Sequence, residues 1–158
     1  MQQDALDQMV DHTAIDRLLR AYADVVNRRA WAELADLFLP DATGELDLVT
    51  APPRTIHGPA ELGAFVGPAI ARFTFFEFVV LNAHVDLWPD GDRDAATARV
   101  FMCELRHDGD TRERSDAFGL YRDRYARTAD GWRFAHRRYR SIARFPAGDA
   151  FPLPSFDD

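Results

Sequence analysis

Two stretches of the chain decide its fold: residues 21–31, AYADVVNRRAW, and residues 121–137, YRDRYARTADGWRFAHR. The first stretch predicts the end of an apolar-faced helix, a tight turn, and a tryptophan that opens a second short helix. The second predicts two long strands joined at Asp130 and Gly131, because Asp-Gly is a preferred hairpin turn. Helices early in the chain and paired strands late indicate an α+β domain.

The pattern outward from these stretches completes the order of elements. Apolar residues at helical spacing begin near Thr13, so residues 1–11 are expected to form a loose arm or an extra helical turn. The second helix, over residues 31–38, is expected to end at Pro40. The other expected elements are short strands over residues 43–48 and 54–57, a helix over residues 59–70 broken or kinked at Gly67-Pro68, and long strands over residues 73–87, 95–106, 114–127 and 132–144.

Composition limits the class of protein. A length of 158 residues suits one domain, and 47% hydrophobic residues argue against disorder. The net charge of −7 does not favour a nucleic-acid partner. The sequence shows neither a signal peptide nor an apolar run long enough to cross a bilayer, and a lone Cys103 gives no disulfide or zinc pattern. A cytoplasmic protein without a metal, a nucleic-acid partner or a membrane is expected.

On these stretches the chain resembles the SnoaL-like branch of the NTF2-like superfamily, over roughly residues 11–144. The resemblance implies an NTF2-like (cystatin-like) cone, in which N-terminal helices pack on a strongly curved mixed, mainly antiparallel sheet. It also implies a homodimer and a pocket for an apolar small molecule. We expect one domain over residues 1–144. The tail over residues 145–158, with several aromatic side chains among prolines, is expected to cover the pocket or a subunit interface.

The resemblance makes one departure visible. In dehydratase-like relatives, an Asp near the end of the first helix and a His on the first long strand form a proton-transfer dyad. The matching positions here hold Asn27 and Phe78, the latter four residues before Asn82. An asparagine can orient a histidine but cannot stabilise its cation as a carboxylate does. The usual acid/base pair is therefore missing.

His84 is one candidate substitute. Side chains two residues apart along a strand point to the same side of the sheet, and six residues of strand span about 20 Å, the separation expected between positions 78 and 84. One face is therefore expected to carry Phe78, Val80, Asn82 and His84. A one-residue bulge would reverse this pattern, and the alternative role for His84 is a hydrogen-bonded sheet residue near a turn.

Glu104 is the second candidate, within the mostly apolar run VFMCEL at residues 100–105. A carboxylate in apolar surroundings has a raised proton affinity and can serve as general acid or base. The alternative is a sheet carboxylate paired with an arginine. Glu77 raises the same question with the opposite strand parity.

Four catalytic and five binding positions follow. The catalytic set is His84, Glu104, Tyr22 and Asn27, and the substrate-binding set is Asn82, Phe78, Trp31, Val80 and Met102. Tyr22, Asn27 and Asn82 would hold the oxygen that gains negative charge. For Tyr22 and Trp31, packing in the core is the competing interpretation.

The resemblance implies a cofactor-independent lyase, isomerase or cyclase that acts by proton transfer on an apolar polycyclic or polyketide-like molecule. It also implies a place in bacterial secondary metabolism or catabolism. The alternative is a non-catalytic small-molecule-binding or accessory protein that has lost the dyad. An epoxide hydrolase, for which Glu104 and Arg106 supply part of the site, is a third hypothesis. Two or more titratable groups converging on one cavity would favour the enzyme, and a purely apolar cavity the binder.

Overall fold

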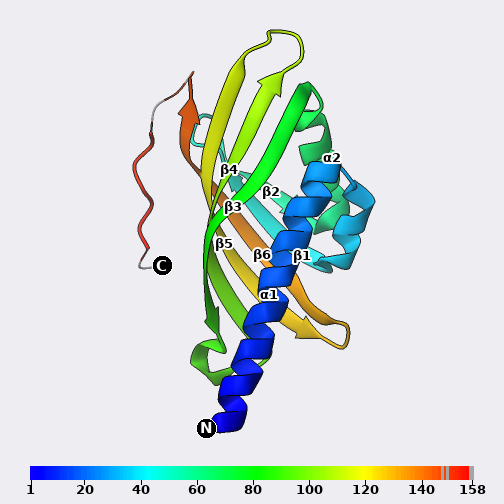
Figure 1. Cartoon of the computed structure of the whole chain (residues 1–158), viewed down its shortest axis with the longest axis vertical. Coiled ribbons are helices and arrows are strands. Elements are labelled where there is room, and N and C mark those ends of the chain that lie inside the picture. Colours follow the sequence, from blue (N-terminus) through cyan, green and yellow to red (C-terminus); the bar gives the residue numbers. More distant parts are fainter. Residues whose placement is uncertain (147, 149, 157–158) are drawn as a thin grey trace.

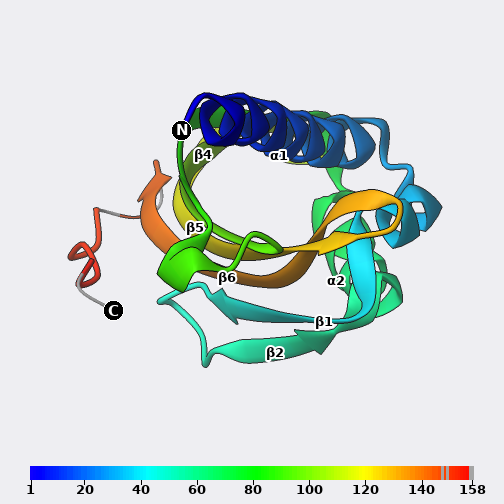
Figure 2. The same cartoon turned by 90° about the horizontal axis from the view of Figure 1, so that it is seen from below.

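The computed structural model describes residues 1–146, 148 and 150–156, and shows helices packed on a curled sheet (Figure 1). The elements are α1 (Gln2–Arg28), η1 (Trp31–Asp36), β1 (Phe38–Asp47), β2 (Arg54–His57), α2 (Gly58–Ile70), β3 (Phe73–Leu87), η2 (Pro89–Gly91), β4 (Ala95–Asp108), β5 (Arg114–Thr128) and β6 (Gly131–Phe145). The strand order is β2-β1-β6-β5-β4-β3, and only the pairing of β1 with β6 is parallel. Seen from below, α1 spans the open side of the curled sheet (Figure 2). The expected α+β architecture with a mixed, mainly antiparallel sheet is confirmed.

The first helix begins at Gln2, so the loose arm expected over residues 1–11 is wrong. The alternative, an extension of the helix, is what the structure shows, although the extension is longer than one turn. Contacts far along the chain hold this early part of α1. Arg93 donates from Nη1 to Asp4 Oδ1 at 2.8 Å and from Nη2 to Asp7. Local helical periodicity does not reveal this segment, whose ion pairs join it to a loop that is distant in sequence.

Asp11 joins α1 to the far end of the sheet. Only 4% of its side chain is exposed, and its carboxylate accepts hydrogen bonds from Trp88 Nε1 at 3.0 Å and Trp132 Nε1 at 3.1 Å. Arg127 Nη2 also donates to it. Burial raises the pKa of Asp11, but the hydrogen bonds from Arg127 and the two indoles outweigh it, so the pKa lies below its ordinary value. The carboxylate is therefore a charged structural anchor.

The first strand begins at Phe38, so the expected start at residue 43 is wrong, and Pro40 lies inside β1 instead of closing a helix. Between Phe38 and Thr43 the register with β6 is irregular, and pairing with β2 starts only at Thr43. A proline is tolerated there because no ladder hydrogen bond requires its missing N–H.

Helix α2 is continuous through Pro68 to Ile70, so the expected break is absent. Pro68 lies in the last turn of α2, where the loss of one backbone hydrogen bond does not interrupt the helix. Trp31 packs against the glycines of α2: a Cβ at Gly63 would lie 3.1 Å from Trp31 Cβ, and one at Gly67 would lie 3.0 Å from Trp31 Nε1. Trp31 is thus a packing residue between η1 and α2.

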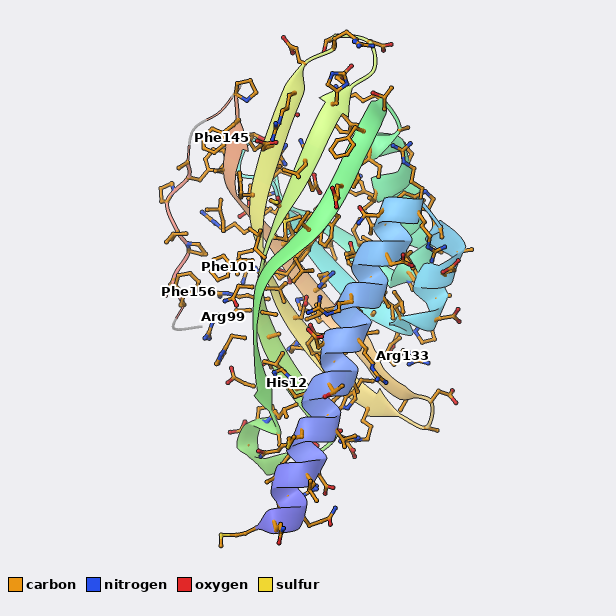
Figure 3. All side chains as sticks on the ribbon, viewed as in Figure 1. His12, Arg99, Phe101, Arg133, Phe145 and Phe156 are labelled. Carbon is orange, nitrogen blue, oxygen red and sulfur yellow. The ribbon has the colours of Figure 1, made fainter. Side chains whose placement is uncertain are left out.

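The described part of the tail runs along the outer face of the sheet, away from α1 (Figure 1). Phe151 N donates to Ile142 O at 2.7 Å, and Arg122 donates to Ser155 O. Figure 3 shows Phe156 on the same side of the sheet as Arg99 and Phe101. The end of the domain at residue 144 and a subunit interface under the tail stay predictions.

Candidate functional site

A cavity of about 220 Å³ is lined by α2 and by the sheet, including Phe73 where β3 begins and Arg144 near the end of β6. One half of its wall is apolar and comes chiefly from α2 and β1: Leu46, Leu48, Leu62, Phe65, Val66 and Ile70. The other half carries polar and titratable groups from α1, β4, β5 and β6: Tyr22, Glu104, Arg106, Tyr121, Tyr139 and Arg144. The convergence of titratable groups that favours an enzyme is therefore present, and the described tail residues do not line this cavity.

Glu104 and Arg106 stand two positions apart on β4 and form an ion pair. Arg106 Nε donates to Glu104 Oε2 at 3.0 Å, and Arg106 Nη2 donates to the same oxygen. Both hydrogen bonds to described residues end on Oε2 and none on Oε1, and 21% of the Glu104 side chain is exposed. The ion pair thus fixes the carboxylate while leaving one oxygen for a ligand.

Three tyrosines supply neutral hydroxyl groups. Burial raises the pKa of Tyr22, and the positive charge of Arg137 offsets part of this rise. Burial raises the pKa of Tyr121 well above its ordinary value and also raises that of Tyr139. All three phenols therefore stay protonated at neutral pH and can donate a hydrogen bond to a ligand oxygen.

A buried ion pair packs against two of these rings, those of Tyr22 and Tyr121. Arg137 donates from Nε to Asp123 Oδ1 and from Nη2 to Asp123 Oδ2, both at 2.7 Å. Its guanidinium carbon lies 4.3 Å from the ring centre of Tyr22 and 4.0 Å from that of Tyr121. Sequence reasoning missed this pair, although the alternation in YRDRY puts Tyr121, Asp123 and Tyr125 on one face. A buried aspartate there calls for a cation.

The expected place of His84 in the pocket is wrong because β3 contains a bulge. Val80 pairs with Met102 and Asn82 pairs with Phe101, so Leu81 is an extra residue. The extra residue reverses the side-chain parity: Val80 packs on the core, whereas Asn82 is exposed.

His84 follows Asn82 onto the exposed face. Its side chain is 58% exposed, and its Nε2 lies 3.2 Å from Asp86 Oδ1. Neither His84 nor Asn82 lines the cavity, so neither can hold a ligand there. Glu104, on the neighbouring strand, is the candidate base that the structure places in the cavity wall.

The two positions that match the dyad, Asn27 and Phe78, are in contact, but the Asn27 side chain bonds to the main chain of Phe78. Asn27 Nδ2 donates to Phe78 O at 3.0 Å, and Phe78 N donates to Asn27 Oδ1 at 2.7 Å. Both ends of the Asn27 amide are thereby occupied. The Phe78 ring is buried and meets the Tyr22 ring edge-on, with 5.5 Å between centroids. The expected catalytic position of Asn27 at the ligand is therefore wrong.

The remaining expected binding residues belong to the core. Phe78 and Met102 are buried in the hydrophobic core, and Val80 and Trp31 pack against it. None of the four lines the cavity. Of the nine expected site residues, the structure thus brings Tyr22 and Glu104 together at the cavity.

Two absences hold for the part of the chain that the structure describes. No described helix is both long and apolar enough to span a lipid bilayer. No group of three or more His, Cys, Asp or Glu side chains among these residues could hold a metal ion.

Comparisons with known proteins agree with the fold described above. The profile of the SnoaL-like domain family matches residues 7–138. No curated protein sequence matches the chain significantly. A proposed scytalone dehydratase from Novosphingobium aromaticivorans superposes with a TM-score of 0.78 at 19% identity, over 97% of this chain and 99% of that one.

Two further solved structures have the same architecture. The hexachlorocyclohexane dehydrochlorinase LinA-type3 from Novosphingobium barchaimii has a TM-score of 0.75 at 20% identity, over 95% of this chain and 99% of its own. An NTF2-like protein with a cystatin-like fold from N. aromaticivorans has a TM-score of 0.72 at 21% identity, over 89% and 88%. At such identities the likeness establishes the NTF2-like fold and nothing about activity.

Proposed function

The chain belongs to the SnoaL-like domain family, and on that premise we propose that it is a cofactor-independent enzyme that transfers a proton on an apolar small molecule. The main support for the proposal is the arrangement of the Glu104 carboxylate in the cavity wall. Arg106 holds one of its carboxylate oxygens, and the other has no partner among the described residues, in a cavity that is otherwise half apolar. A fixed carboxylate with one available oxygen is suited to general acid/base catalysis.

The reaction that fits this wall begins at a carbon next to a carbonyl. Glu104 Oε1 accepts the proton, the C–H bond breaks, and its electron pair moves into an enolate. The enolate oxygen accepts a hydrogen bond from one of the neutral phenols, Tyr22, Tyr121 or Tyr139, in a partly dry site where such a bond is strong. The protonated Glu104 then returns its proton to another carbon, as in an isomerase, or to a departing hydroxyl group, as in a lyase.

The cavity limits the size of the ligand. Its volume of about 220 Å³ is below the range of about 300–1,000 Å³ that is usual for sites of drug-sized ligands. We therefore propose a molecule of one or two rings in place of a large polycyclic polyketide. A role as polyketide cyclase, a place in secondary metabolism, a homodimer and a cytoplasmic location remain predictions.

A non-catalytic binding or accessory protein is the second candidate. Its support is the substitution at both dyad positions, where Asn27 and Phe78 make structural contacts only. Such a protein would use the same cavity, and Glu104 would serve only to pair with Arg106.

Solvent deuterium exchange separates the two candidates. The probe is 2-tetralone, a two-ring ketone with activated C–H bonds, followed by proton NMR in deuterium oxide. We expect the wild-type protein to accelerate exchange and Glu104→Gln to reduce the acceleration by about a hundredfold or more, the usual contribution of a general base. Glu77→Gln and His84→Ala are matched controls on the exposed face of β3 and should leave the rate unchanged.

The outcomes assign the function. Binding of 2-tetralone without accelerated exchange supports the binding protein. Acceleration that survives in Glu104→Gln removes Glu104 as the base.

A further inference from the structure

The charged groups of the cavity wall do not balance. The wall contains three arginines, Arg72, Arg106 and Arg144, but a single carboxylate, that of Glu104. Arg106 is paired with Glu104. Arg72 lies at the rim with 67% of its side chain exposed, and its Nε is 3.2 Å from Asp108 Oδ2. Arg144 is the cation left without a carboxylate among the described residues.

Arg144 uses little of its hydrogen-bonding capacity. Its Nε and Nη2 both donate to one oxygen, Ser141 Oγ, at 3.4 Å. This distance exceeds the usual range of about 2.7–3.2 Å. The same hydroxyl also lies 3.3 Å from Tyr139 OH, and the hydrogen bonds of Arg144 to described residues come from Nε and Nη2, not from Nη1. Because a guanidinium has five N–H donors in a fixed fork, most of this group is available to a ligand.

We propose that Arg144 binds a carboxylate of the ligand, so that the cavity takes an apolar molecule of one or two rings that bears a carboxylate group. The inference rests on the cavity of the proposed function and names its ligand class. A carboxylate matches the fork of a guanidinium in a two-pronged, charge-assisted pair. It would also supply the negative charge that the described wall lacks opposite this arginine.

Arg144 and the proposed base, Glu104, line the same cavity, together with Tyr139. The Tyr139 hydroxyl lies 3.3 Å from Ser141 Oγ, the same oxygen to which Arg144 donates from Nε and Nη2. Glu104 does not reject an anionic ligand, since its own charge is matched by Arg106.

A binding comparison tests the inference without any need for turnover. The probes are 2-naphthoate and its neutral analogue 2-naphthamide, which share rings and shape, measured by isothermal titration calorimetry. We expect wild-type protein to bind 2-naphthoate about tenfold or more tightly than the amide, as a charge-assisted pair provides. Arg144→Gln should abolish this preference while leaving the affinity for the amide unchanged. Arg20→Gln, at an exposed arginine of α1 that pairs with Asp16 and does not line the cavity, is the matched control and should keep the preference.

The controls keep the result decisive. Arg144→Lys retains the charge without the fork, so an intermediate preference is expected, and urea denaturation verifies that each variant is folded. Equal binding of the two probes by wild-type protein, or a preference that survives in Arg144→Gln, overturns the inference. Failure of both probes to bind removes the cavity as a ring-binding site and takes the proposed function with it. If the wild-type protein does not accelerate deuterium exchange but still prefers 2-naphthoate, the proposed enzymatic function fails and the inference on Arg144 holds.

Discussion

The side chain of Asn27 and the main chain of Phe78 form a closed pair of hydrogen bonds. Asn27 Nδ2 donates to Phe78 O at 3.0 Å, and Asn27 Oδ1 accepts from Phe78 N at 2.7 Å. The resemblance to dehydratase-like relatives matches these two positions to an acid/base dyad, and the structure brings them together across 51 residues of chain. In this protein the contact ties the end of α1 to β3, and the chemistry has to come from elsewhere in the wall.

Replacement of Asn27 tests this role. Asn27→Asp removes the N–H donor and places a carboxylate oxygen against Phe78 O, so we expect a loss of about 1–3 kcal/mol in the free energy of unfolding. Urea denaturation measures it. Asn82→Asp, at an exposed position of β3, should change stability by less than about 0.5 kcal/mol. Equal effects at the two positions would contradict the structural tie.

Asp11 predicts a pH-dependent stability. Asp11→Asn removes the charge that Arg127 and the indoles of Trp88 and Trp132 surround, and we expect a loss of about 2–3 kcal/mol near pH 7. The folded-state pKa of Asp11 is lowered, so its contribution is fully present above the unfolded value of about 4. It is lost as pH falls through the lower folded-state pKa.

Unfolding at pH 7 and pH 3 therefore gives a clear comparison. The difference in stability between wild type and Asp11→Asn should shrink at the lower pH. Asp16→Asn, at an exposed pair with Arg20, is the control and should have little effect at either pH. A difference that stays constant with pH would contradict the charged anchor.

The buried pair of Asp123 and Arg137 should show strong coupling. Asp123→Leu alone leaves the guanidinium of Arg137 buried without a counter-ion, and we expect a loss of about 3–5 kcal/mol. The double variant Asp123→Leu with Arg137→Met removes both charges and should recover a large part of that loss. Chemical denaturation of the two single variants and the double variant gives the coupling energy. Additive losses would contradict the pairing.

Gly119 is predicted to shape the cavity wall. A Cβ at this position of β5 would overlap the ring of Tyr139, which lines the cavity. Gly119→Ala should therefore lower stability by about 1–3 kcal/mol and weaken binding of 2-naphthamide, as calorimetry can show. Gly44→Ala is the matched strand control, since its Cβ would meet Ile56 Cβ at an ordinary 3.4 Å. Similar losses in both variants would mean that the Tyr139 ring is not held over Gly119.

Local patterns in the chain were sufficient for much of the architecture. The apolar period up to Val26 predicted α1 from about Thr13 onward, and the Asp-Gly turn at Asp130 and Gly131 predicted the hairpin of β5 and β6. These succeed because helix period and turn chemistry depend on neighbours in sequence. The early start of α1 escaped prediction because its anchors, Arg93 and Trp132, are distant in sequence.

For the candidate site, the sequence alone determined which types of residue are available. The chain has no lysine, Glu104 is the single glutamate of a mostly apolar strand, and Tyr22 lies on the inner face of the first helix. Only the tertiary structure decided which of them meet. A single extra residue at Leu81 turned His84 outward, since strand parity reverses with every inserted residue, whereas the curl of the sheet gathered Glu104 and Arg144 around one cavity. Such convergence depends on register and curvature, which are set by packing between strands remote in the chain.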